Sequence, residues 1–197
     1  MKLRSLLVVA VTLALGLGAA SCSSDNDSLA NQYKSGDTKN YISGDGAVSE
    51  FGAKDRGAPV DFTTKDLQGA EVTAEGLRGK VAVLNFWYAS CAPCRAEAKD
   101  LESVSQKTTS DATFVGVNVR DSSGTAEAFV RSFNVQYTNV LDADSGAVQI
   151  AFAGKNAPNS TPATIVLDKQ GRVSSRILGQ INANVLETLV NDAAKSS

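Results

Sequence analysis

From about residue 58 onward, short apolar runs alternate with polar turns and amphipathic stretches. Residues 81–87 (VAVLNFW) form a nearly continuous apolar run, which is typical of a central strand covered on both faces. Residues 113–119 form a second such run. Two further apolar segments, 163–167 and 173–178, flank the polar turn DKQGR and predict two strands joined by a tight turn. The pattern therefore predicts at least four strands.

Helical and hairpin signals lie between and around these strands. Residues 93–107 predict a helix directly after the first apolar run, and residues 185–190 carry apolar side chains at helical spacing near the C-terminus. Asn184 and Glu187 resemble a capping pair for that last helix. Residues 60–63 and 71–73 alternate around a turn, which predicts a β-hairpin. Strands that alternate with helices indicate an α/β fold with helices on both faces of the sheet.

The first 21 residues predict an export signal. Lys2 and Arg4 supply positive charge, and residues 6–20 form an apolar run that is short for a membrane span. Small residues then precede Cys22 and resemble the lipobox of bacterial lipoproteins, although Ala19 stands where that pattern usually has Leu. The resemblance implies that Cys22 is lipidated and becomes the first mature residue. The alternative is a plain secretory peptide, and both predict export.

Residues 22–56 predict a flexible tether that leads to a domain spanning residues 57–197. The tether is rich in Ser, Asp, Asn, Gly and Lys and has few large apolar residues, so it has little surface to bury. The alternative is a partly docked extension, for which Phe51 is the best candidate contact. We expect the tether to hold the domain away from a membrane surface.

Composition excludes several function classes. The formal net charge of −2 shows no basic excess that would indicate nucleic-acid binding. The chain has no histidine, which removes Ser-His and Cys-His catalysis. With only three cysteines and no histidine, a four-ligand zinc site is also disfavoured. We expect no metal site and no organic cofactor.

Two of the three cysteines, Cys91 and Cys94, form a CxxC motif at the turn between a predicted strand and a predicted helix. This arrangement is typical of a thioredoxin-like redox site. A helix N-terminus favours a thiolate, so Cys91 is expected to be the exposed attacking thiol. Cys94 is expected to be shielded and to resolve the mixed disulfide. Pro93 fits the first helical turn, where it costs no hydrogen bond.

At these positions the chain resembles the TlpA/ResA-like thioredoxin-fold proteins of bacterial cell envelopes. The matching segments follow in order over most of the domain: Asp61-Phe62, Gly79-Lys80, Cys91-Ala92-Pro93-Cys94-Arg95 with Glu97, Gly116-Val117-Asn118, Thr161-Pro162-Ala163-Thr164, and Leu167-Asp168 with Gly171. One departure is Ser90, which stands where the family commonly has Trp. The smaller side chain leaves the surface beside Cys91 more open and bears on the choice of partner.

The resemblance implies a thioredoxin-like fold, with a central mixed β-sheet, helices on both faces and an N-terminal β-hairpin extension. It implies that Pro162 is cis and that Thr161 pairs with a bound substrate strand. Glu97 corresponds to an acid that passes protons, although an exposed first-turn acid is the plainer alternative. Asn85 cannot ionise where cytoplasmic thioredoxins have a buried Asp. Trp87 is either a core or rim aromatic or a substrate contact.

The implied activity is thiol-disulfide exchange outside the cytoplasm, by a monomer anchored through a lipid to the outer face of the cytoplasmic membrane. Reduction of exported proteins such as apocytochromes c is favoured, with a membrane redox partner that recycles the cysteine pair. Oxidation of secreted proteins is the alternative direction. A thiol peroxidase and a binding lipoprotein with a purely structural disulfide remain alternatives from other classes.

Overall fold

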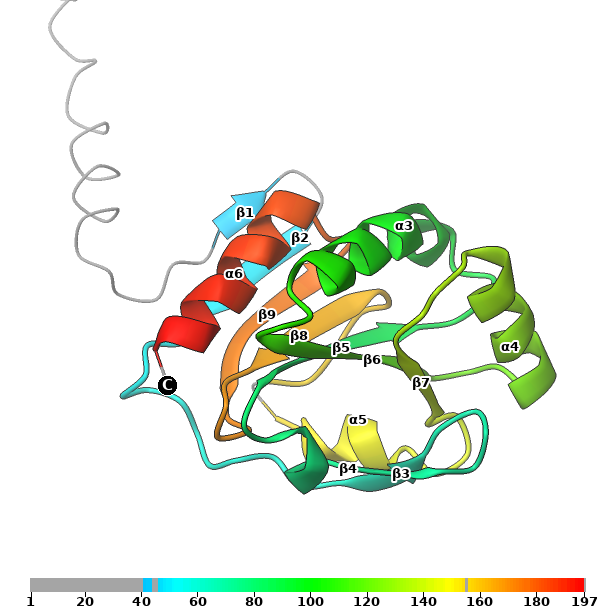
Figure 1. Cartoon of the computed structure of the whole chain (residues 1–197), viewed down its shortest axis with the longest axis horizontal. Helices are drawn as coiled ribbons and strands as arrows, with labels where there is room; N and C mark the ends of the chain where they lie inside the picture. The colour runs from blue at the N-terminus through cyan, green and yellow to red at the C-terminus, as the bar shows by residue number, and fades with distance from the viewer. Residues whose placement is uncertain (1–40, 44–45, 155, 197) are drawn as a thin grey trace, which may run out of the picture. The chain divides into compact units, whose positions relative to one another are not determined.

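The computed structural model describes residues 41–43, 46–154 and 156–196, and within them a seven-stranded sheet runs in the order β1-β2-β9-β8-β5-β6-β7 (Figure 1). The strands are β1 (Tyr41–Ser43), β2 (Gly46–Glu50), β5 (Val81–Trp87), β6 (Ala112–Asn118), β7 (Thr138–Leu141), β8 (Ala163–Leu167) and β9 (Val173–Gly179). β3 (Thr63–Lys65) and β4 (Glu71–Thr73) form a separate antiparallel pair. All four predicted sheet strands are confirmed. The predicted hairpin is present, but its first strand is Thr63–Lys65 and does not include residues 60–62.

β5 lies in the centre of the mixed sheet. It pairs parallel with β6 and antiparallel with β8, and all seven of its residues are buried. This burial explains the nearly continuous apolar run, which only Asn85 interrupts, because a strand covered on both faces has no polar side. The parallel steps from β5 to β6 and from β6 to β7 are bridged by α3 (Ala92–Lys107) and α4 (Ser123–Ser132), as parallel neighbours require.

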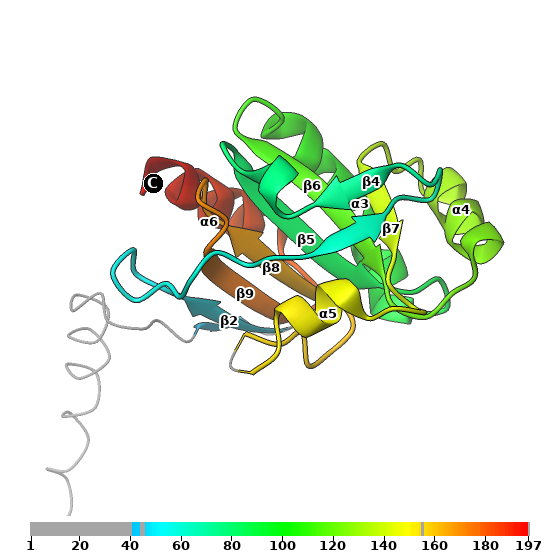
Figure 2. The same cartoon turned by 90° about the horizontal axis from the view of Figure 1, so that it is seen from below.

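Two layers cover the sheet. α3 and α6 (Ala183–Lys195) lie on one face, and α5 (Ala147–Ala151) and the β3–β4 hairpin lie on the other (Figures 1 and 2). Leu101 of α3 and Leu186 of α6 are buried in one apolar cluster with Val83 of β5. Phe86 and Phe152 pack edge to face in the second cluster, on the opposite side. The predicted α/β thioredoxin-like fold, with helices on both faces, is thereby confirmed.

The predicted tether is shorter than expected at its C-terminal end. β2 pairs antiparallel with β9, and the backbone N–H of Phe51 donates to Ser174 O at 2.8 Å. The prediction of a flexible segment up to residue 56 is therefore wrong for residues 41–43 and 46–56. The structure instead agrees with the alternative, a partly docked extension in which Phe51 contacts the core. The polar composition of this segment hid two strands, β1 at the edge of the sheet and β2 beside it, which are held by backbone hydrogen bonds and do not need a continuous apolar face. The predicted signal peptide and Cys22 lie outside the described residues.

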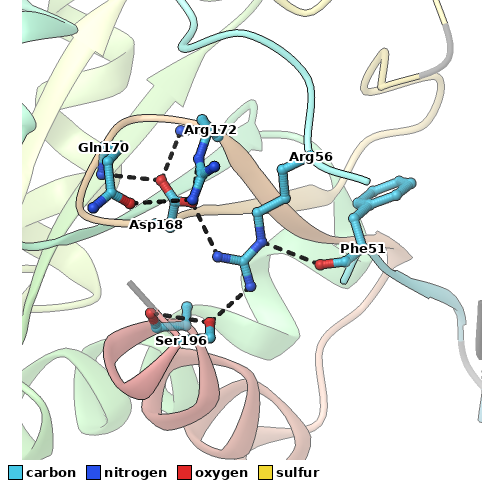
Figure 3. A network of polar contacts seen from close by, with 7 residues as sticks. Phe51, Arg56, Asp168, Gln170, Arg172 and Ser196 are labelled. Carbon is cyan, nitrogen blue, oxygen red and sulfur yellow. Dashed lines mark hydrogen bonds and ion pairs between the residues drawn. The ribbon is translucent and has the colours of Figure 1, made fainter. Parts of the chain in front are cut away.

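A buried ion-pair network fastens the segment after β2 to the rest of the domain (Figure 3). Arg56 donates to Asp168 Oδ2 at 3.0 Å, to Phe51 O at 3.1 Å and to Ser196 Oγ at 2.8 Å. Arg172 donates to the same Asp168 oxygen at 2.8 Å. The side chains of Arg56 and Asp168 are 5% and 0% exposed. The network thus joins the N-terminal segment, the β8–β9 turn and the end of α6.

The N-cap of the last helix lies two residues before the predicted one. Asn182 is the N-cap of α6, and its Oδ1 accepts from the N–H groups of Asn184 at 3.0 Å and Val185 at 3.3 Å. The predicted cap, Asn184, is already helical, because the apolar spacing marks the buried stripe and does not mark the first turn. In the described part of the chain, no helix is long and apolar enough to cross a membrane.

Candidate active site

The CxxC motif lies at the C-terminal end of β5, as predicted. The chain leaves the strand after Trp87, and the Cys91 N–H donates to Tyr88 O at 3.1 Å, which closes a tight turn. Cys91 then serves as the N-cap of α3, with Pro93 in the first helical turn. Pro is tolerated there because its missing N–H would have no partner inside the helix. The turn therefore points the first cysteine at the unsatisfied N–H groups of the helix.

Cys91 and Cys94 form a disulfide, with their Cα atoms 5.3 Å apart. The Cys94 N–H points at Cys91 Sγ, 3.2 Å away. A thiolate on Cys91 would accept this N–H and lie at the positive end of the helix dipole, so the geometry favours Cys91 as the nucleophile. The two residues are only 3% and 2% exposed. Cys91 is thus more shielded in this disulfide form than expected, because neighbouring loops cover it.

One of these loops carries the Thr161-Pro162 step. The peptide bond between the two residues is cis, which confirms the expectation. Thr161 O lies 3.8 Å from Cys91 Sγ, and Pro162 O accepts the Gly179 N–H at 2.9 Å. Within the described residues, the Thr161 N–H has no hydrogen-bond partner. A backbone donor and acceptor beside the disulfide are what an added substrate strand needs.

Glu97 is fully buried beneath the motif, so the structure decides against the exposed alternative. Its Oε1 accepts from Asn85 Nδ2 at 2.8 Å, and its Oε2 accepts from the Ile181 N–H at 2.8 Å. Asn85 Nδ2 also donates to Thr164 Oγ1 at 3.1 Å. Burial raises the pKa of Glu97 from 4.5 to about 7, although both hydrogen bonds oppose the rise. The carboxyl group can therefore take up and release a proton near neutral pH.

Trp87 lies in the core under the disulfide and does not form part of the rim. It is 3% exposed, stacks on Phe129 at 4.2 Å between ring centroids, and donates from Nε1 to Asn139 Oδ1 at 3.1 Å. The expectation of substrate contact is therefore not met, because the indole fills the space between β5 and α4. Gly116 lies against this pair, and a Cβ there would lie 2.9 Å from Trp87 Nε1.

Two arginines contact the turn before Cys91. Arg95 lies over the Phe133 ring, with Cζ 5.0 Å from the centroid, and donates to Ala89 O at 3.3 Å. Arg120 lies over the Tyr88 ring at 4.1 Å. Arg95 belongs to the matching CxxC segment, whereas no motif in the sequence singled out Arg120. A signal existed, since Tyr88 and Arg120 both follow the C-terminal ends of the parallel strands β5 and β6.

Metal binding has no support in the described part of the chain. Among residues 41–43, 46–154 and 156–196, no three His, Cys, Asp or Glu side chains are grouped so that they could hold a metal ion. Acidic side chains near the site have other roles. Asp121 Oδ2, for example, accepts from the Ala89 N–H at 2.6 Å and from Asn118 Nδ2 at 2.8 Å. The chemistry available at the site is therefore that of the cysteine pair and the carboxyl group below it.

Known proteins are similar to this chain in sequence and in fold. Soluble secreted antigen MPT53 of Mycobacterium tuberculosis is 37% identical over 99 residues, which cover 50% of this chain and 54% of that protein. The thiol:disulfide interchange protein HelX of Rhodobacter capsulatus is 32% identical over 133 residues, which cover 66% of this chain and 65% of HelX. The chain thus spans about half to two thirds of these relatives.

A secreted thiol-disulfide isomerase from Corynebacterium glutamicum has a similar structure, with a TM-score of 0.68 and 26% identity. The similarity covers 80% of this chain and 98% of that one. The profile of the AhpC/TSA family matches residues 56–176, a segment that runs from the buried Arg56 through the disulfide and the cis-proline to β9. The chain therefore belongs to the AhpC/TSA family.

Proposed function

We propose that this protein is a thiol-disulfide oxidoreductase that acts on exported proteins through Cys91 and Cys94. The observation that carries the proposal is the disulfide at the N-terminus of α3, with Thr161 O 3.8 Å from Cys91 Sγ. A reactive sulfur beside an open backbone edge can meet a substrate cysteine presented on an extended strand. The relatives named as interchange and isomerase proteins support the same activity.

In the proposed reaction the Cys91 thiolate attacks a substrate disulfide, forms a mixed disulfide and releases one substrate thiolate. The Cys94 thiol loses its proton and attacks Cys91 Sγ, which frees the second substrate thiolate and closes the Cys91–Cys94 disulfide. Two electrons pass from the enzyme to the substrate, and the substrate thiolates take up two protons. Glu97 is placed to receive the Cys94 proton, since it lies three residues farther along the same helix and is buried.

We propose that the physiological direction is reduction, with exported proteins such as apocytochromes c as candidate substrates. An ionised Glu97 under the motif disfavours a second negative charge on the cysteines, so it opposes stabilisation of the reduced, thiolate form. Potent oxidants have a strongly stabilised reduced form, whereas reductants do not. A membrane dithiol partner would return the two electrons to the pair after each cycle.

The decisive measurement is the reduction potential of the Cys91–Cys94 pair, combined with trapping of partners by Cys94→Ala. A potential near about −270 mV supports a reductant, and one near about −120 mV would reverse the direction. The Cys94→Ala protein should hold substrates as mixed disulfides on Cys91, and Cys91→Ala should hold none.

Peroxide consumption faster than that of a free thiol would indicate a peroxidase. Full function of Cys91→Ala would indicate a structural disulfide.

We also propose that the domain works outside the cytoplasm, anchored through a lipid on Cys22 at the outer face of the cytoplasmic membrane. The apolar run that ends in small residues before Cys22 supports this, and one relative is named as a secreted antigen. Replacement of Cys22 by Ser should move the protein from the membrane fraction to the soluble fraction. Retention in the membrane after that change would contradict lipidation.

A further inference from the structure

Two guanidinium groups are fixed beside the turn that carries the reactive cysteine. Arg120 lies over the Tyr88 ring at 4.1 Å, and the Cys91 N–H donates to Tyr88 O at 3.1 Å. Arg95 lies over the Phe133 ring at 5.0 Å and donates to Ala89 O within the same turn at 3.3 Å. Both guanidinium groups are therefore tied to the short turn that presents Cys91.

Both arginines are exposed, and neither forms an ion pair within the part of the chain that the structure describes. Other arginines of the domain do pair with carboxylates, namely Arg56, Arg131 and Arg172. An aromatic ring holds a guanidinium by its flat face, so its N–H edge stays available to an acceptor. The guanidinium groups of Arg95 and Arg120 are therefore placed to donate hydrogen bonds to a carboxylate.

The surrounding charge does not cancel this feature. Asp121 follows Arg120 and keeps its negative charge, but its Oδ2 accepts from the Ala89 N–H and Asn118 Nδ2, and it forms no ion pair with Arg120, so this one carboxylate only partly offsets the two guanidinium groups. Glu97 is fully buried and does not reach the surface. The chain as a whole has a formal net charge of −2, so the two cations do not reflect a generally basic protein. They form a pair of cations, called here the rim, on the turn of residues 88–90 that precedes Cys91.

We propose that the site prefers protein disulfides whose cysteine is flanked by Asp or Glu. This inference rests on the proposed oxidoreductase function and names its substrate class. A substrate strand that pairs with the Thr161 backbone brings its sulfur to Cys91 and the residues around that sulfur to the rim formed by Arg95 and Arg120. Ser90 is exposed and small, so no bulky side chain separates the rim from the incoming strand. Carboxylates can then bind the guanidinium edges in bidentate fashion.

The test uses three peptides that share one internal disulfide and differ only in four flanking residues, which are all Asp, all Asn or all Lys. The reduced full-length protein is mixed with each peptide, and Trp87 fluorescence reports closure of the Cys91–Cys94 disulfide. This reporter is specific, since the chain has a single tryptophan and that residue packs in one cluster with both cysteines. Each rate is divided by the rate at which dithiothreitol reduces the same peptide, which removes differences in intrinsic reactivity.

The Asp peptide should react about five- to tenfold faster than the Asn peptide at low salt, and the Lys peptide should react more slowly than both. The Asp advantage should fall below about twofold at about 0.5 M salt, because exposed charges are screened. Arg95→Gln and Arg120→Gln should each lower the Asp to Asn ratio. Arg120→Lys should retain only part of it, because Lys keeps the positive charge but cannot bind a carboxylate in bidentate fashion. The ratio is used because a changed thiol reactivity alters both rates equally.

Arg78→Gln is the matched control. Arg78 is exposed and precedes β5, so it lies at the opposite end of that strand from Cys91 and should leave the ratio unchanged. Equal rates for the Asp and Asn peptides in the wild-type protein would overturn the proposed preference, as would a ratio that both Gln variants preserve. If the wild-type protein reduces none of the peptides and also fails with the uncharged bis(2-hydroxyethyl) disulfide, the oxidoreductase function itself is wrong, and the preference with it.

Discussion

Replacement of Glu97 by Gln should remove a defined part of the pH dependence of stability. Glu97 is fully buried, and its pKa is raised from 4.5 to about 7 mainly by that burial. One pKa unit corresponds to about 1.4 kcal/mol, so ionisation of this carboxyl group in the folded protein costs about 3 kcal/mol more than in the unfolded chain. Screening by solvent is negligible here because the side chain has no exposed surface.

The direction of this pH dependence follows from the difference in proton binding between the folded and unfolded protein. Between about pH 4.5 and 7 the folded protein still holds the Glu97 proton, whereas the unfolded chain has lost it. The contribution of Glu97 to the wild-type free energy of unfolding should therefore be highest below pH 4.5, fall by about 3 kcal/mol up to pH 7, and change little above that pH. Gln cannot ionise, so the variant should lack this fall.

The assay is urea unfolding of the oxidised protein at several pH values, followed by Trp87 fluorescence. The disulfide must stay closed so that the cysteines do not titrate. Gln also replaces one acceptor oxygen with a donor, so the absolute stability of the variant will shift, but only the difference between pH values enters the test. Glu75→Gln, which removes an exposed acid far from the motif, should keep the wild-type profile. If Glu97→Gln and wild type show the same fall, Glu97 does not titrate as the structure indicates.

Three further changes test the packing and polar contacts that hold the site in place. Gly116→Ala should destabilise the fold by about 1–3 kcal/mol in urea unfolding, because the added Cβ meets Asn139 and Trp87; wild-type stability would show that this pair can move apart. Asp168→Asn should cost about 3 kcal/mol at neutral pH, since it leaves a buried guanidinium without its carboxylate. Burial alone would raise the pKa of Asp168, but the N–H and guanidinium donors around it hold the pKa below its usual value. Asp168 therefore stabilises the fold at pH values above its usual pKa, and this stabilisation is lost as the pH falls through the lowered pKa. An unfolding curve in acid that is the same for Asp168→Asn and wild type would contradict this account. Asn182→Ala should cost about 1 kcal/mol by thermal unfolding, through loss of the α6 cap, and an unchanged midpoint would reject the cap.

The position of the reactive pair follows from local sequence alone. The nearly continuous apolar run of β5 predicts a central strand, and Pro93 predicts a helix start. The CxxC that contains Pro93 must therefore lie where the strand turns into the helix. These are properties of neighbouring residues, so no long-range information is needed. The cis bond before Pro162 was expected from the resemblance to TlpA/ResA-like proteins, because an X-Pro step in isolation favours trans.

Other features depended on contacts between distant segments. Residues 46–50 have a weak pattern of their own and become a strand only because β9 offers an edge to pair with. Arg120 meets Tyr88 only because β5 and β6 run parallel and end together. Neighbouring residues do not reveal these contacts. Tyr88 and Arg120 each follow the end of a predicted strand, but whether they meet depends on how the two strands pair.

Glu97 shows most clearly which properties follow from the sequence and which depend on the tertiary structure. The sequence determined that it lies on the Cys94 side of the helix, through the three-residue spacing, but left open whether that side faces solvent or core. Tertiary structure decided the matter, because the Ile181 N–H and Asn85 Nδ2 meet its two oxygens inside the protein. Burial then sets the protonation behaviour, since desolvation acts on a carboxylate only when the rest of the fold excludes water from it.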